Sequence, residues 1–131
     1  MILDSSAVTA IFLKEPEAEA LLKAIADAPI VGISAATFVE VGIVLSHRLN
    51  RPMQDDLDYF FSKMDVQIIA FDNEHRMLAL NAWWQFGRTR SKANLNFGDC
   101  IAYATAKLSG QPLLYKGDDF PLTDVRSALD A

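Results

Sequence analysis

Cysteine is almost missing from the sequence, since Cys100 is the only one among 131 residues. A lone cysteine cannot form an internal disulfide, so nothing indicates an oxidising compartment. The chain also lacks a basic N-terminal segment followed by an extended apolar run, which excludes a typical signal peptide. Its longest apolar stretch, near 35–45, is too short to span a bilayer and is interrupted by Glu40. We therefore expect a cytoplasmic protein with no membrane segment.

Several common catalytic signatures are missing as well. The sequence has neither a glycine-rich phosphate loop nor a GxGxxG motif. His47 and His75 are not spaced as a zinc pair, and we expect both to lie on helix surfaces. Ser5 and Ser6 have no visible histidine partner, and Cys100 lies in an apolar helical run that favours a core position. These absences argue against zinc, serine and cysteine chemistry.

The composition is that of an ordinary globular chain, with 51% hydrophobic and 22% charged residues, and we expect a single domain over 1–131. The net charge of −5 alone argues against nucleic-acid binding. The segment from Arg88 to Lys107 is different, because it carries four basic residues and only one acid, Asp99. Its basic cluster, Arg88, Arg90 and Lys92, is either a solvated loop or a patch that holds phosphate.

Short apolar runs alternate with stretches of helical periodicity. We predict strands over 1–3, 30–33, 66–71 and 112–115, and helices over 5–13, 15–26, 35–49, 54–64, 73–86 and 98–108. Ser34 and Asp72 are expected to cap two of the helices, and 87–96 is a polar, basic loop. This alternation predicts an α/β sandwich of three layers, in which helices cover both faces of a mainly parallel sheet. Binding sites in such folds lie at the carboxyl ends of the strands.

Two acidic residues stand out at this edge. Asp4 follows the first strand, where it is either a helix cap or part of a site. Glu40 lies among apolar residues on a predicted helix, and an ionised carboxylate there costs several kcal/mol unless it is paired or bound to a metal. Glu40 could also occupy an exposed position or pair with a distant arginine.

Three further acids complete the pattern. Asp99 is expected in the first turn of a helix, where the dipole keeps it anionic, and Asp118 and Asp119 follow the last strand. Each also has a simpler interpretation, as an end-of-helix acid or as part of a turn. If these acids converge with Asp4 and Glu40 on one rim of the sheet, their repulsion favours a hard divalent cation, Mg²⁺ or Mn²⁺.

Four motifs in order along the chain resemble those of PIN-domain proteins, specifically VapC-type toxin ribonucleases of toxin–antitoxin systems. They are Met1-Ile-Leu-Asp-Ser-Ser-Ala7, Ser34-Ala-Ala-Thr-Phe-Val-Glu40, Leu95-Asn-Phe-Gly-Asp-Cys100 and Pro112-Leu-Leu-Tyr-Lys-Gly-Asp-Asp-Phe120. The last motif departs from the family, because Tyr115 replaces the usual threonine and Gly117 takes a position that is often Asn or Asp. The resemblance extends over essentially the whole length.

The resemblance implies a PIN-like fold and an endoribonuclease that depends on Mg²⁺ or Mn²⁺. Asp4, Glu40 and Asp99 match the first three acids of the family, and the fourth is Asp119 or Asp118. Ser6 matches a supporting hydroxyl near the site. In this scheme Asp4 and Asp99, with Glu40, hold the metal, and the products carry a 5′-phosphate and a 3′-hydroxyl.

The resemblance also implies partners and leaves alternatives. It implies an antitoxin, an RNA substrate such as tRNA or rRNA, and a homodimer. Five aromatic residues, Phe60, Phe61, Trp83, Trp84 and Phe86, are candidates for contact surfaces, although such residues usually form the core. The alternatives are a non-cleaving PIN-like module that binds RNA or protein, and a phosphatase or phosphotransferase. The latter usually needs a second Asp two residues after the first, where this chain has Ser6.

Overall fold

Strands and helices alternate along the chain, as the sequence predicts. The computed structural model describes residues 1–129. Its elements, in chain order, are β1 (Ile2–Leu3), α1 (Ser5–Phe12), α2 (Ala18–Asp27), β2 (Val31–Ser34), α3 (Ala35–Leu49), α4 (Gln54–Lys63), β3 (Val66–Ile69), α5 (Asn73–Phe86), α6 (Phe97–Ser109), β4 (Leu113–Leu114) and a short 3₁₀ helix (Phe120–Leu122). The prediction of one domain over 1–131 stays a prediction, and residues 130–131 lie outside the described part.

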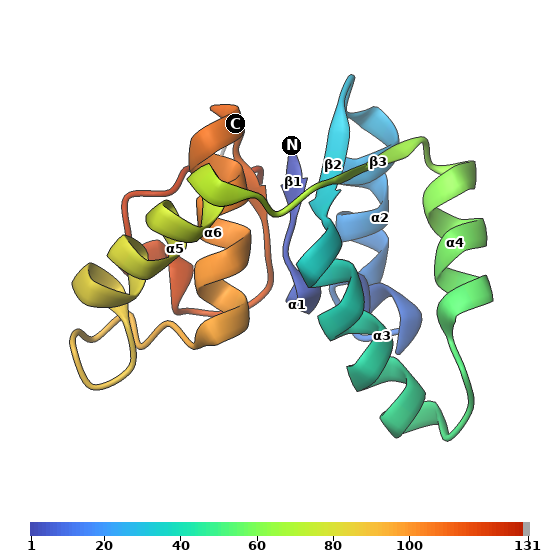
Figure 1. Ribbon diagram of the computed structural model, residues 1–131. Helices are drawn as coiled ribbons and strands as arrows, with labels where there is room; N and C mark the ends of the chain where they lie inside the picture. The colour runs from blue at the N-terminus through green and yellow to red at the C-terminus, as the bar shows by residue number, and fades with distance from the viewer. Residues whose placement is uncertain (130–131) are drawn as a thin grey trace.

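The four strands form one parallel sheet in the order β3-β2-β1-β4. The first strand of the chain is therefore central, and Ile2 pairs with Gly32 on one side and Leu113 on the other. Ser127 pairs with Leu113 from outside, so the C-terminal segment covers the free edge of β4. Because all strands run in the same direction, the residues after β1, β2 and β4 meet at one end of the sheet, which lies at the bottom of Figure 1.

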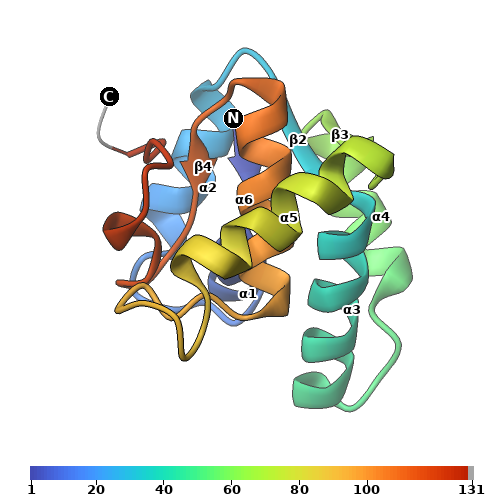
Figure 2. The ribbon, with the colours of Figure 1, turned by 60° about the vertical axis from the view of Figure 1, so that its left-hand side comes forward.

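Helices cover both faces of the sheet. Helices α1 to α4 lie on one face, and α5 and α6 lie on the other (Figures 1 and 2). Successive strand residues point to opposite faces, so Leu3 and Leu114 pack under α1–α4 while Ile2 and Leu113 pack under α5 and α6. The predicted three-layer α/β arrangement is confirmed, with a sheet that is parallel in all its pairings among residues 1–129.

Local signals set the helix ends. Ser34 Oγ accepts the N–H of Ala36 and caps α3, and Asp72 caps α5, as predicted. The predicted start of α2 at residue 15 is three residues too early, because Lys14 adopts a left-handed conformation and a residue before proline is disfavoured in a helix. Strand β3 ends at Ile69, earlier than predicted, because β2, its partner in the sheet of residues 1–129, ends at Ser34 opposite it.

Within residues 1–129, no helix combines the length and the apolar character that are needed to cross a bilayer.

Candidate active site

Asp4 lies directly after β1 and caps α1 at the carboxyl edge of the sheet. It is only 1% exposed. Its Oδ2 accepts hydrogen bonds from the backbone N–H and the hydroxyl of Ser6, at 3.0 and 2.5 Å. The same hydroxyl accepts the backbone N–H of Lys116, after β4, at 2.9 Å. Ser6 therefore ties the Asp4 carboxylate to the ends of two neighbouring strands, while Asp4 Oδ1 is buried with no hydrogen-bond partner among the described residues.

Glu40 comes from α3 and lies against the start of α6. A Cβ atom on Gly98 would overlap the Glu40 carboxylate, at 2.5 Å from its Cδ. Only glycine at position 98 allows this close approach, so the Gly-Asp dipeptide at the start of α6 packs Glu40 beside Asp99. Glu40 Oε1 is a second buried carboxylate oxygen that has no hydrogen-bond partner among the described residues.

Asp99 is held in the first turn of α6 by a reciprocal cap. Its Oδ2 accepts the N–H of Asn96 at 3.0 Å, and its own N–H donates to Asn96 Oδ1 at 2.8 Å. This capping box fixes the side chain at the helix start. Asp99 is partly exposed, in contrast to Asp4. The site is therefore open to solvent on the Asp99 side.

The charges of these acids act on one another's pKa. Burial, with smaller contributions from the charges of Asp99 and Glu40, raises the pKa of Asp4 to about 7 against the lowering effect of its hydrogen bonds to Ser6. Burial, and then the charge of Asp99, raises the pKa of Glu40. Burial also raises the pKa of Asp99, as does the charge of Asp119. The predicted acids thus converge from β1, α3, α6 and the segment after β4 on one rim of the sheet.

This donor set fits a hard divalent cation. All of its donors are carboxylate oxygens, which suit Mg²⁺ or Mn²⁺, and the unpartnered oxygens of Asp4 and Glu40 are buried without compensation. Within residues 1–129, no group of three or more aspartate, glutamate, histidine or cysteine side chains is arranged so that it could hold a metal ion without movement. An open arrangement suits Mg²⁺, which usually keeps several waters and takes one or two protein carboxylates.

The two candidates for the fourth acid differ in their surroundings. Both Asp118 and Asp119 are exposed in the segment after β4. The charge of Asp119 raises the pKa of Asp99, whereas Asp118 is not among the groups that shift it. This difference favours Asp119. The neighbouring Lys116 ammonium is paired with Glu15 and Glu17, and it thereby joins the segment after β4 to the loop between α1 and α2.

Of the three predicted phosphate contacts, one acts on the acid cluster. The positive charge of Arg88 lowers the pKa of Asp99 against the raising effects of burial and of Asp119. The Arg90 guanidinium instead lies over the Trp84 ring, 3.7 Å from its centroid, and its Nε donates to the Trp84 carbonyl. Lys92 is exposed. Among the three basic residues of this loop, Arg88 is therefore the one whose charge affects the pKa of a candidate acid.

Two contributions were missed at the sequence level. The Ser5 side chain lowers the pKa of Glu40 against the larger effect of burial. Consecutive serines thus act on two different acids, Ser5 on Glu40 and Ser6 on Asp4. The second is the contact between Gly98 and Glu40. The sequence signals are two hydroxyls directly after the strand-end Asp and a glycine directly before the helix-start Asp.

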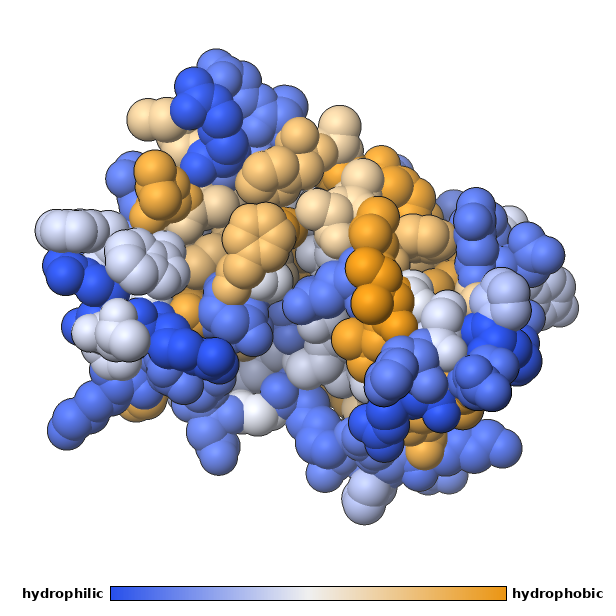
Figure 3. Space-filling view, turned by 60° about the horizontal axis from the view of Figure 1, so that its bottom comes forward, coloured by the Kyte–Doolittle hydropathy of each residue, from blue (hydrophilic) through white to orange (hydrophobic). Residues whose placement is uncertain are grey.

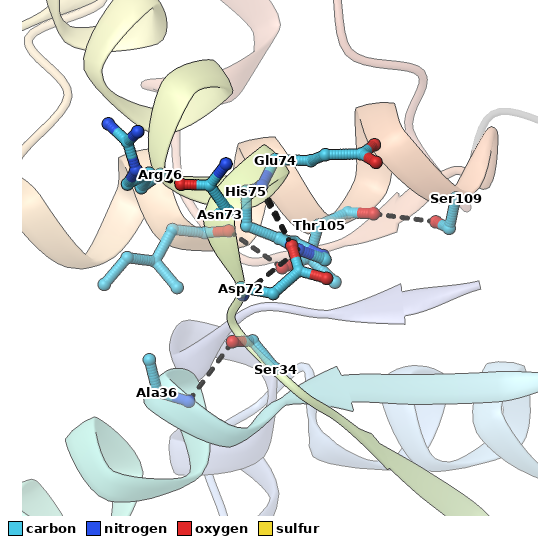
Figure 4. Close-up of polar contacts among 10 residues, drawn as sticks. Ser34, Ala36, Asp72, Asn73, Glu74, His75, Arg76, Thr105 and Ser109 are labelled. Carbon is cyan, nitrogen blue, oxygen red and sulfur yellow. Dashed lines mark hydrogen bonds and ion pairs between the residues drawn. The ribbon is translucent and has the colours of Figure 1, made fainter.

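Two predictions about other side chains had different outcomes. Cys100 is buried, and burial raises the pKa of its thiol to about 11, so it is a core residue as expected. His75 was expected on a helix surface, but it is only 5% exposed. Its Nδ1 lies 2.7 Å from Asp72 Oδ1, and the pair closes the capping box of α5 (Figure 4).

The aromatic residues suggested as contact surfaces divide into two groups. Phe61 is buried, and Phe60 and Phe86 are partly buried against the two cores, as the sequence favours for most such aromatic residues. Their side chains fill space between the helices and the sheet. Trp83 and Trp84 are 36% and 62% exposed on α5.

The sequence is similar to a known domain family and to several named proteins. The chain matches the family model of the PIN domain over residues 1–125. It is 43% identical over 125 residues to the protein named Ribonuclease VapC of Mycolicibacterium smegmatis, a match that covers 95% of this chain and 97% of the relative. It is 37% identical to Ribonuclease VapC30 of Mycobacterium tuberculosis, with 95% of both chains covered.

Solved structures share the fold. A chain of a toxin–antitoxin complex from Klebsiella pneumoniae matches with a TM-score of 0.69 and 21% identity, covering 94% of this chain and 92% of that chain. VapC20 of Mycobacterium tuberculosis, a sarcin–ricin loop cleaving toxin, matches with a TM-score of 0.72 and 16% identity over 95% of both chains. At these identities the likeness concerns the fold alone.

Proposed function

The chain belongs to the PIN-domain family, and from that premise we propose that it is a VapC-type toxin, an endoribonuclease that hydrolyses RNA phosphodiester bonds with the help of a divalent cation. Close relatives named VapC ribonucleases, aligned over nearly the full chain, support this function. The catalytic assignment is supported by the contact of Gly98, next to Asp99, with the Glu40 carboxylate, and by the effects of Asp4, Glu40, Asp99 and Asp119 on one another's pKa at one sheet edge.

Asp4 and Asp99, with Glu40, would hold the cation, with Mg²⁺ preferred over Mn²⁺. The cation, when bound, lowers the pKa of a water molecule and offsets charge on the scissile phosphate. Ser6 keeps the Asp4 carboxylate in place through its two hydrogen bonds to Oδ2. Asp4 Oδ1 remains available for a ligand, because none of the described residues hydrogen-bonds to it.

The remaining groups would manage the proton and the phosphate. Glu40 and Asp119 would either complete the shell of the cation or orient the attacking water and accept its proton. The site is anionic and so is RNA, so positive side chains must reduce the repulsion. Arg88, whose charge already acts on Asp99, is the side chain best placed to hold a phosphate of the substrate, while Arg90 and Lys92 would contribute at longer range.

Cleavage of RNA tests the proposal directly. The wild-type chain should cut a mixed pool of bacterial RNA when Mg²⁺ or Mn²⁺ is added, leaving 5′-phosphate ends, and EDTA should stop the reaction. Binding without cutting would instead support a non-cleaving PIN-like module. Hydrolysis of a small phosphomonoester without RNA cutting would support a phosphatase.

An antitoxin and a homodimer are further parts of the proposal. Exposed apolar side chains on α3 and α5, such as Ile43 at 65% and Trp84 at 62%, offer surface for protein contacts. Co-expression with a small reading frame directly upstream should suppress toxicity and yield a co-purifying complex. Light scattering should give twice the mass of 14.5 kDa for the isolated chain. A cytoplasmic location stays a prediction.

A further inference from the structure

Thr37 carries a buried hydroxyl that has no hydrogen-bond partner among residues 1–129. The residue lies on α3 and is only 1% exposed. Its Oγ1 is one of three buried side-chain polar atoms without a partner in this part of the chain, and the other two are Asp4 Oδ1 and Glu40 Oε1. Because most buried polar groups in proteins are hydrogen-bonded, this hydroxyl requires an explanation, and so does its company.

The fold places Thr37 at the same edge of the sheet as the acids. It is the third residue of α3, which begins directly after β2, and Ser34 at the end of β2 caps this helix (Figure 4). Strands β1 and β2 are neighbours in the sheet and pair at Ile2 and Gly32. Two residues further along each strand the chain reaches Asp4 and Ser34, so Asp4 lies beside the start of α3.

The first turns of α1 and α3 meet at this edge. Residues three apart on a helix lie on the same face, so Glu40 follows Thr37 one turn along α3. Helix α1 packs against α3, and the Ser5 side chain, in the first turn of α1, acts on the pKa of Glu40. The Thr37 hydroxyl and the two carboxylate oxygens without partners therefore belong to one region of the fold.

A second buried threonine shows the ordinary arrangement. Thr105 on α6 is fully buried, and its hydroxyl donates to the carbonyl of Ile101, one turn earlier, at 3.1 Å (Figure 4). A threonine within a helix commonly satisfies its hydroxyl in this way. The corresponding carbonyl for Thr37 is that of Ile33, and this bond is not made. The Thr37 hydroxyl is thus left to serve another group.

The hydrogen-bonding capacities of the three oxygens are complementary. An ionised carboxylate only accepts hydrogen bonds, whereas a threonine hydroxyl also donates one. Thr37 therefore supplies a donor to a group whose other two members, Asp4 Oδ1 and Glu40 Oε1, are acceptors.

The carboxyl end of the sheet is open to a hydrated cation. Figure 3 turns this end toward the viewer and shows hydrophilic residues around the middle and lower part of the face, with hydrophobic side chains above them. Within residues 1–129 the acids are not yet arranged to hold a metal ion, so the carboxylates must shift when a cation binds. A hydrogen-bond donor among them determines where a carboxylate settles.

We propose that Thr37 is a positioning residue of the cation site, whose hydroxyl donates to a buried carboxylate oxygen of the acid cluster when the cation binds and so holds that carboxylate in place. The proposal rests on the proposed metal-dependent function. Groups that hydrogen-bond to the ligands of a metal change its affinity about 10- to 100-fold when they are removed. Thr37 acts through the acids, which carry the cation.

Metal binding by matched variants tests this role. Thr37→Val keeps the shape of the side chain but loses the hydroxyl, so it should weaken Mn²⁺ binding, measured by titration calorimetry, about tenfold. Thr37→Ser keeps the hydroxyl and should bind Mn²⁺ nearly as tightly as the wild type. The matched control is Thr105→Val, which removes a buried hydroxyl that bonds to the backbone of α6 and should leave the Mn²⁺ affinity unchanged.

Thermal melts in EDTA give a second readout that a purely structural role would reverse. Thr37→Val should melt at the wild-type temperature or above it, because it removes a buried polar group without a partner. Thr105→Val should melt lower, because it breaks the bond to Ile101. A lower melting temperature of Thr37→Val with unchanged Mn²⁺ affinity would show that the hydroxyl only stabilises the fold, and would overturn the proposal.

Cleavage separates this proposal from the ribonuclease assignment. At limiting Mn²⁺, RNA cleavage by Thr37→Val should fall about tenfold and should recover at saturating Mn²⁺, with the KM for RNA unchanged. Wild-type cleavage together with wild-type Mn²⁺ affinity in Thr37→Val would refute the role of Thr37 alone. If the wild-type chain cuts no RNA but its Mn²⁺ affinity still depends on the hydroxyl, the ribonuclease assignment has failed and the role of Thr37 stands.

Discussion

The starts of α1 and α5 use the same local motif in two different surroundings. Each begins with an aspartate that closely follows a strand of the parallel sheet, Asp4 after β1 and Asp72 after β3. Each carboxylate caps its helix. Asp4 accepts the N–H of Ser6 at 3.0 Å, and Asp72 Oδ1 accepts those of Glu74 and His75 at 3.1 and 3.3 Å.

The surroundings shift the pKa values of these two capping aspartates in opposite directions. The Asp72 side chain is 60% exposed, and its hydrogen bond to His75 lowers its pKa. Figure 4 shows the Asp72 and His75 side chains facing one another at the start of α5. Asp4 is buried, which raises its pKa to about 7, and two further carboxylates lie nearby. An exposed strand-end cap with a histidine partner is therefore structural, whereas a buried one beside two further carboxylates is a candidate ligand site.

The largest difference between the two caps should appear in catalysis. Asp4→Asn keeps an oxygen that can cap α1 but removes a charge from the metal site, so RNA cleavage should fall roughly 1,000-fold or more, as for loss of a preorganised electrostatic group. Circular dichroism should show that the fold survives. The matched variant, Asp72→Asn, should cleave RNA at the wild-type rate. Equal activity in the two variants would remove Asp4 from the mechanism.

The second difference is the pH dependence of stability without metal. The pKa of the Asp4 carboxyl rises from 3.8 in the unfolded chain to about 7 in the folded protein, so the native state binds this proton more tightly. Its contribution is therefore complete below pH 3.8 and is lost as the pH rises to about 7, by about 4 kcal/mol at most. In EDTA, the free energy of unfolding by urea should thus decrease from pH 5 to pH 7.5.

Two controls sharpen this test. Asp4→Asn should remove most of the decrease in unfolding free energy between pH 5 and pH 7.5, because its amide does not titrate. Added Mg²⁺ should stabilise the wild-type protein at pH 7.5 more than at pH 5, since ligand binding to the native state needs the deprotonated acids. An unfolding free energy that is equal at both pH values in EDTA would show that Asp4 is solvated in the native protein.

The sequence identifies the candidate acids where one residue carries its own signal. Asp4 was found by its place after an apolar strand, and Glu40 by the apolar residues around it. The location of the site could be predicted without knowing the order of the strands in the sheet, because the carboxyl ends of parallel strands share one edge. The choice between Asp118 and Asp119 remained open, because adjacent residues in a turn differ only in the direction of their side chains.

Other features depend on contacts between distant segments and had no signal. His75 stands between Glu74 and Arg76, which is typical of a helix surface, yet its ring fills the space under α5 beside Phe71. Strand β3 was predicted too long, because the length of an edge strand is set by its partner. The role of Ser5 appears only once α3 packs against α1.

The third prediction concerns the crowding that distinguishes the Asp4 region from the Asp72 region. Gly98→Ala places a methyl group against the Glu40 carboxylate, so Glu40 must move and cleavage should fall about 100-fold, as for a displacement of about 1 Å at a catalytic group. Gly42→Ala is the matched control on α3, because its Cβ would meet only Leu57 Cδ1 at 3.8 Å.

Gly42→Ala should retain full cleavage and raise the melting temperature slightly, since alanine favours a helix over glycine. Single-turnover cleavage and thermal melts of both variants separate the two effects. If Gly98→Ala cleaves as fast as Gly42→Ala, the position of Glu40 is not needed for the reaction.

The smallest effect should come from the exposed cap itself. Asp72→Ala removes the acceptor for the N–H groups of Glu74 and His75 and leaves the buried His75 ring without its partner, so the melting temperature should fall by about 3–5 °C. Asp72→Asn, which keeps an acceptor at the helix start, should lose less. RNA cleavage should be unchanged in both variants, because α5 contributes none of the four converging acids. A loss of cleavage in Asp72→Ala at a temperature where the protein is folded would show that the start of α5 is coupled to the site, and the contrast between the two caps would then be one of degree.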